Sequence, residues 1–166
     1  TGTDRIAEVS KKIKKSIYIN VQGDEPICNP KDIKKIVNFA KKNPNVIING
    51  YREIKDKEMF NSPNVPKVVF DRNEKLLYTS RAPIPSNKKK KFIKAWRQVC
   101  IYSFPYKSLK IYTSVKKKTT LESIEDLESN RFLELGYQVH MLKMSNKSVA
   151  VDTKEDVAKV KKLVKN

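Results

Sequence analysis

The sequence predicts an α/β protein with a Rossmann-like, mixed and mostly parallel sheet, helices on both faces and an antiparallel insertion. Short apolar runs typical of strands alternate with segments in which apolar residues recur every three or four positions, as on one face of a helix. The alternation is interrupted where Asp71-Arg72-Asn73-Glu74 separates two apolar runs, a pattern typical of a hairpin turn. With 166 residues and no internal repeat or linker, we expect a single domain over residues 1–166.

Each element follows from a local pattern. Ile6, Val9 and Ile13 have helical spacing. Asn29-Pro30 is a cap followed by a first-turn proline, and Gly136 is a good helix end. Helices are expected over residues 3–15, from 29–30 to 43–44, over 121–135 and from a cap at Thr153 onward. Strands are expected over residues 17–21, 46–49, 65–70, 76–79, 99–104 and 137–144.

The chain carries a formal net charge of +18, and of its 36 basic residues six are Arg and 30 are Lys. Proteins that read bases and phosphates favour the bidentate guanidinium of Arg. The lysines are also spread over the predicted helices, so we interpret the charge as background that steers small anions such as nucleotides. A nucleic-acid partner is not expected. A basic RNA-binding module without catalysis remains the alternative from another functional class. Its affinity for RNA would fall steeply as salt increases and would not change in the Asp24→Asn variant.

Other features of the composition exclude further classes. Two cysteines, Cys28 and Cys100, are too few for a disulfide framework or a zinc site. No run of 18 or more apolar residues occurs, so no membrane span is expected.

Acidic residues follow two apolar runs that are far apart in the sequence. The run 17–21 stops at Gln22-Gly23 and delivers Asp24 and Glu25, and Asp152 follows the apolar run 149–151. Open α/β sheets bind ligands at strand ends, and Mg²⁺ commonly takes one or two carboxylates plus substrate phosphates. The pattern therefore indicates one magnesium site built from Asp24 and Asp152. The alternative is that both acids cap helices, which Asp favours.

The chain opens on a helix without a preceding strand, and its four glycines form no glycine-rich phosphate loop. We expect either that phosphate is bound differently or that a front segment is missing.

A resemblance to a known family rests on three segments, residues 1–9, 20–26 and 151–157, which occur in the same order and at similar separations as in that family. The most specific part of the resemblance is the run Gln22-Gly23-Asp24-Glu25-Pro26. Residues 80–85, and 121–128 with Arg131, add to it. Together they resemble the 3-deoxy-D-manno-octulosonate cytidylyltransferases, or CMP-Kdo synthetases, over nearly the whole chain. The resemblance implies the fold of nucleotide-diphospho-sugar transferases, with residues 1–166 as the C-terminal portion of a nucleotidyltransferase domain.

The resemblance implies transfer of a cytidylyl group from CTP to 3-deoxy-D-manno-octulosonate (Kdo), giving CMP-Kdo and pyrophosphate for lipopolysaccharide biosynthesis. It assigns Asp24 and Asp152 to Mg²⁺ and to catalysis, and Arg81 to the substrate carboxylate, although an ion pair at the surface is the alternative for Arg81. It implies a cytoplasmic homodimer. The positions it assigns to substrate binding are Gly2, Thr3, Arg5, Gln22, Glu25, Ser80, Gln98, Tyr102, Glu122 and Glu125.

Two alternatives accompany this assignment. The alternative to a substrate-binding role for Glu122 and Glu125 is that both are solvated glutamates on a lysine-rich protein. Gln98 stands where many members of the family carry a histidine, so a CMP transferase for another sugar acid, of the amino-Kdo or neuraminate type, is the second enzymatic hypothesis. Because the family's N-terminal strand and triphosphate loop have no counterpart here, this chain alone is expected to be inactive or very weak, and an inactive remnant is a further alternative.

Overall fold

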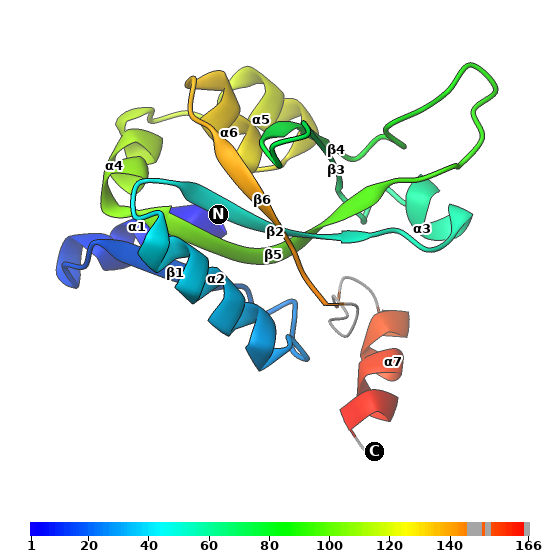
Figure 1. The fold of residues 1–166 in the computed structure, drawn as a ribbon, viewed down its shortest axis with the longest axis horizontal. Coiled ribbons are helices and arrows are strands. Elements are labelled where there is room, and N and C mark those ends of the chain that lie inside the picture. Colours follow the sequence, from blue (N-terminus) through cyan, green and yellow to red (C-terminus); the bar gives the residue numbers. More distant parts are fainter. Residues whose placement is uncertain (146–150, 152–153, 165–166) are drawn as a thin grey trace.

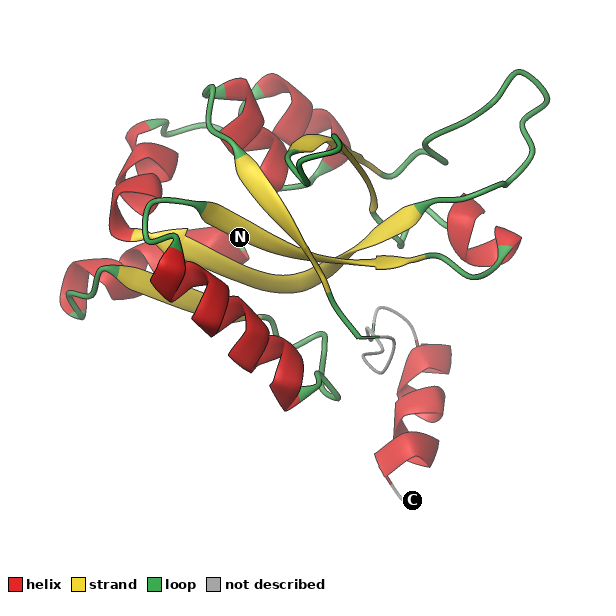
Figure 2. Ribbon diagram, in the orientation of Figure 1, coloured by secondary structure: helices red, strands yellow, loops and turns green. Residues whose placement is uncertain are grey.

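The computed structural model describes residues 1–145, 151 and 154–164 (Figures 1 and 2). Its helices are α1 (Gly2–Lys12), α2 (Pro30–Lys42), α3 (Lys57–Asn61), α4 (Tyr106–Ser114), α5 (Thr120–Glu125), α6 (Ser129–Glu134) and α7 (Lys154–Val164). Its strands are β1 (Ile17–Val21), β2 (Ile47–Glu53), β3 (Lys67–Phe70), β4 (Leu76–Ser80), β5 (Trp96–Pro105) and β6 (Val139–Lys143). No helix among these residues is long and apolar enough to cross a membrane.

The strands form one mixed sheet, which confirms the predicted class, and β3 and β4 form the predicted hairpin. The expectation of a mostly parallel sheet is wrong, because β2 and β6 are the only parallel neighbours among the described strands. The β1–α2–β2 crossover does produce two strands of the same direction. The long strand β5 lies between them, however, and is antiparallel to both. Local patterns reveal strands but not which distant strand enters between them.

Helices cover both faces of the sheet, as predicted (Figure 2). On one face, Ile36 and Ala40 of α2 pack with Ile48, Val99 and Ile101 of β2 and β5. On the other face, the core includes Ala7 of α1, Leu109 and Tyr112 of α4 and Phe132 of α6. Asn29 caps α2 as expected, since its side chain accepts a hydrogen bond from the N–H of Lys31.

The predicted helix over residues 121–135 is instead two short helices, α5 and α6. The chain breaks at Asp126, whose φ of 51° lies in the left-handed region that Asp tolerates better than most residues. The apolar spacing continues through the break, which is why periodicity alone did not reveal it. Gly136, with φ of 78°, follows α6 and takes the conformation expected of a helix end. The expected cap Thr153 lies outside the described residues.

A β-bulge interrupts the pairing of β2 with β5. Asn49 pairs with Tyr102, but the next residue, Gly50, pairs with Val99, so β5 carries extra residues at this point. A side chain at Gly50 would meet Val99 and Met144, because a Cβ there would lie 3.0 Å from Met144 Cγ. The bulge occurs where β5 passes the cavity described next.

Candidate functional site

A cavity of about 440 Å³ opens where β1 and β5 meet the α5–α6 connection. Segments far apart in the sequence supply its walls, as expected of a ligand site. Of the residues assigned to the site from the sequence, Gln22, Asp24, Arg81, Gln98 and Tyr102 line it. The other lining residues are Arg52, Met59, Asn64, Val65, Pro66, Arg97, Cys100, Asp126, Leu127, Glu128 and Asp156.

Asp24 follows β1 in a tight turn, in which the N–H of Glu25 donates to the carbonyl of Gln22 at 3.2 Å. Its Oδ1 atom is buried and has no hydrogen-bond partner among the residues that the structure describes. Its carbonyl oxygen accepts the N–H of Val151 at 2.8 Å. Val151 is followed in the sequence by Asp152, which lies outside the described residues. The geometry therefore places Val151, the residue before Asp152, beside Asp24.

The chemistry of Asp24 fits a divalent metal ion. A buried carboxylate oxygen without a donor is costly unless a ligand or ion satisfies it. Within the described part of the chain, no group of three or more His, Cys, Asp and Glu residues is placed to hold a metal. Mg²⁺ commonly takes one or two protein carboxylates and completes its coordination with water and substrate phosphates.

Next to Asp24, Glu25 is not among the residues that line the cavity. It is buried, and its Oε1 lies 3.7 Å from Nη1 of Arg97. Burial raises the pKa of Glu25, although Arg97 acts in the opposite direction. Burial, and then Arg97, lower the pKa of Arg52 to about 10, so Arg52 remains cationic at neutral pH. Two guanidinium groups thus belong to the cavity wall beside Asp24.

Arg81 is held by backbone carbonyls, and it forms no ion pair with a carboxylate among the described residues. Its Nε donates to the carbonyl of Glu125 at 2.7 Å, its Nη1 to Pro63 at 3.0 Å and its Nη2 to Asp126 at 3.3 Å. These bonds fasten the α5–α6 connection to the loop before β3. Because a guanidinium has five N–H donors, the three bonds leave donors that a substrate carboxylate can use.

Glu125 organises the segment that carries Arg81. Its carboxylate accepts the Ser80 hydroxyl at 2.6 Å, the Arg81 N–H at 2.8 Å and the Tyr78 hydroxyl at 3.1 Å. Burial alone would raise the pKa of Glu125, but these donors outweigh it and lower the pKa. Ser80 and Glu125 therefore do not line the cavity, but they hold the segment that brings Arg81 to it.

Lys67 provides a second support that the sequence reading missed. Its side chain is fully buried, and its Nζ donates to the carbonyls of Ser62 at 2.8 Å and Arg81 at 2.6 Å. Burial, and then Arg81, lower the pKa of Lys67 to about 8. One ammonium thus ties two cavity-lining segments together.

Gln98, Cys100 and Tyr102 alternate along β5, so their side chains share the face that lines the cavity. Burial raises the pKa of Tyr102 well above its ordinary value, and also raises the pKa of Cys100, beside which lie the carboxylates of Asp24 and Glu25. Both groups are therefore neutral at physiological pH.

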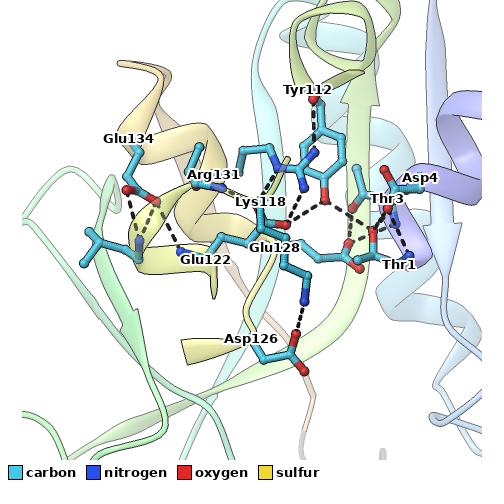
Figure 3. Close-up of polar contacts among 12 residues, drawn as sticks. Thr1, Thr3, Asp4, Tyr112, Lys118, Glu122, Asp126, Glu128, Arg131 and Glu134 are labelled. Atoms are coloured by element: carbon cyan, nitrogen blue, oxygen red, sulfur yellow. Dashed lines mark hydrogen bonds and ion pairs between the residues drawn. The ribbon is translucent and has the colours of Figure 1, made fainter. Parts of the chain in front are cut away.

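Gly2 and Thr3 bind a carboxylate of the protein. Their N–H groups donate to Glu128 at 2.7 and 2.9 Å, at the start of α1, where a negative charge is favoured (Figure 3). Glu128 lines the cavity, although it was not among the residues assigned to the site from the sequence. Arg5, by contrast, is exposed and pairs with Glu8 at 3.4 Å.

Glu122 is turned inward, so its interpretation as a solvated residue is wrong. It is 1% exposed and accepts two hydrogen bonds from Arg131, from Nε at 2.5 Å and from Nη2 at 2.7 Å (Figure 3). The structure does not bring Glu122 to the cavity. A buried glutamate requires a partner, and the partner here is nine residues away on α6.

The charged lining residues that were not assigned to the site from the sequence are Arg52, Arg97, Asp126, Glu128 and Asp156. A signal existed for Arg97, because it adjoins Gln98 in a segment already singled out. A signal also existed for Asp156, which lies within the segment 151–157 that carries the resemblance. No comparable signal marked Arg52, since its contribution depends on the packing of β2 around the cavity.

Comparison with known proteins gives a consistent result. The profile of the cytidylyltransferase family matches residues 1–160. The chain is 35% identical to a 3-deoxy-manno-octulosonate cytidylyltransferase of Syntrophus aciditrophicus, over 99% of this chain and 68% of the relative. It is 32% identical to one from Flavobacterium johnsoniae, over 100% of this chain and 69% of the relative.

A solved structure of CMP:2-keto-3-deoxy-manno-octonic acid synthetase complexed with CTP superposes with a TM-score of 0.89 and 30% identity. The match covers 99% of this chain and 68% of that one, so the chain spans about two thirds of the length of its relatives. A family profile over nearly the whole chain, and relatives above 30% identity, lead to one conclusion: this chain belongs to the cytidylyltransferase family, among the CMP-Kdo synthetases.

Proposed function

We propose that this chain carries the sugar-acid and metal side of a cytidylyl transfer from CTP to Kdo, giving CMP-Kdo and pyrophosphate. The observation that carries the proposal is Asp24, whose buried Oδ1 lacks a hydrogen-bond donor among the described residues at the wall of a cavity with basic side chains. Family membership supplies the reaction class.

In this reaction a hydroxyl oxygen of the sugar acid forms a bond to the α-phosphorus of CTP. The bond from that phosphorus to the bridging oxygen breaks, pyrophosphate leaves with the electron pair, and the hydroxyl proton passes to solvent. Catalysis of this kind depends mainly on positioning and charge neutralisation. Arg52 and Arg97 add positive charge to the wall that faces the anionic substrates, while Gln98 and Tyr102 offer polar atoms that orient the sugar.

Asp24, together with Asp152, would hold Mg²⁺. The ion would act as a Lewis acid and template for the phosphate oxygens. The role of Asp152 rests on its motif position and on the hydrogen bond of Val151 to Asp24. The homodimer and the cytoplasmic location belong to the same proposal, and sedimentation of the purified chain tests the first of these.

Binding is the direct test, because it does not require turnover. Isothermal titration calorimetry would measure the affinity of the chain for Kdo with CTP present, with and without Mg²⁺. We expect Mg²⁺ to strengthen binding at least tenfold, and Asp24→Asn to abolish that gain. Glu8→Gln, which removes an exposed acid of α1, is the matched control and should leave the gain intact.

The acceptor series distinguishes the enzymatic hypotheses. Tighter binding of an amino analogue of Kdo, or of a neuraminate, would replace Kdo as the substrate and keep the reaction class. If no sugar acid binds at millimolar concentration to a folded chain, the proposed function fails.

A further inference from the structure

The β-bulge fixes the orientation of a buried amide. Asn49 Nδ2 donates to the carbonyls of Val99 at 3.0 Å and Ile101 at 3.2 Å, on the bulged part of β5. Carbonyl oxygens only accept, so both N–H bonds of the Asn49 amide are committed to them. Its Oδ1 must therefore serve as the acceptor for any further neighbour.

That neighbour is Gln98, whose orientation follows. Gln98 Nε2 donates to Asn49 Oδ1 at 2.8 Å and to Ser129 Oγ at 3.5 Å. The Ser129 hydroxyl in turn donates to Thr79 Oγ1 at 3.0 Å, which leaves a Ser129 lone pair for Gln98. Both N–H bonds of the Gln98 amide are thus used inside the protein.

Gln98 is 5% exposed and lines the cavity, and within the described residues its Oε1 accepts no hydrogen bond. From this geometry, and resting on the proposed function, we infer that Asn49 positions Gln98 as a fixed hydrogen-bond acceptor. The site therefore selects a sugar acid that presents a donor, a hydroxyl or an ammonium group, to Oε1. A rotation of the amide that offered Nε2 instead would place Oε1 against Asn49 Oδ1, two acceptors facing one another.

The test is a set of binding measurements at pH 8 with Kdo and with analogues that each lack one hydroxyl. For the wild-type chain, one analogue should bind about tenfold more weakly than Kdo, because the hydroxyl that this analogue lacks is the one that donates to Oε1. Gln98→Met keeps the approximate size but has no acceptor of this kind, so it should bind that analogue and Kdo with nearly equal affinity. Gln138→Met, on an exposed glutamine outside the cavity, is the control and should discriminate like the wild type.

Gln98→His separates polarity from shape. A neutral imidazole that donates one N–H to Asn49 Oδ1 presents its other nitrogen as an acceptor, so discrimination should return. Asn49→Leu releases the Gln98 amide and should reduce the discrimination without abolishing Kdo binding; if this variant does not fold, the Gln98 series still decides the question.

Two failures are distinguishable. If Kdo binds but Gln98→Met discriminates like the wild type, or if no hydroxyl matters to the wild type, the inference about Gln98 is wrong and the proposed function stands. If no sugar acid binds to the folded wild-type chain, the proposed function fails and the inference fails with it.

Discussion

Arg131 and Glu122 form a two-pronged ion pair in the protein interior, in which Nε and Nη2 of Arg131 each donate to a separate oxygen of Glu122. The guanidinium also lies over the ring of Tyr112, at 3.8 Å from the centroid, and its Nη1 donates to the Tyr112 carbonyl. The pair thus fastens α5, α6 and α4 to one another behind the cavity wall.

Replacing Arg131 with Met should destabilise the chain by about 3–5 kcal/mol, because Glu122 would keep a buried charge without its partner. The free energy of unfolding in urea measures this loss. Arg5→Met is the matched control, since Arg5 is 83% exposed in its pair with Glu8 and its removal should change stability by about 0.5 kcal/mol or less. Equal effects of the two substitutions would show that the buried pair does not stabilise the fold.

Lys67 should give the chain a stability that rises with pH in the alkaline range. Its pKa is about 8 in the folded chain and 10.5 ordinarily, so between these values the unfolded chain binds more protons. The free energy of unfolding attributable to Lys67 should therefore increase from pH 8 to pH 10, by at most about 1.4 kcal/mol per pH unit. The measurement is the difference in unfolding free energy between the wild type and Lys67→Met across this range. A difference that does not change with pH would contradict the assignment.

Gly2 and Gly23 offer a matched pair of substitutions beside the cavity. A Cβ at Gly2 would lie 2.5 Å from Nε2 of Gln22, whereas a Cβ at Gly23 would meet nothing within 4 Å. The end of Gln22 is flexible, so Gly2→Ala should displace that side chain at little cost in stability. The expected result is substrate binding weakened by roughly threefold to tenfold in Gly2→Ala and unchanged in Gly23→Ala, measured by calorimetry. Unchanged binding in Gly2→Ala would exclude Gln22 from the binding contacts.

The sequence by itself determined the features that depend on neighbouring residues. Helix α2 begins at its Asn29 cap because the side chain and the N–H it accepts are two residues apart. The hairpin turn at residues 71–74 and the strand that delivers Asp24 were likewise predictable, since turn residues and apolar runs act locally. Five of the residues assigned to the site, most of them through the family resemblance, line one cavity.

The tertiary structure decided how distant segments pair. The position of β5 between β1 and β2 made the sheet largely antiparallel, and the left-handed Asp126 divided one periodic segment into α5 and α6. Whether Glu122 faced solvent, substrate or Arg131 depended on which charges packed together in the interior. Which polar atom of the Gln98 amide is left for a ligand depended on the carbonyls of the β5 bulge, because they orient Asn49 and Asn49 orients Gln98. A sequence pattern records which groups can donate and accept, but buried groups take the partners that the packing of remote segments brings within hydrogen-bond distance.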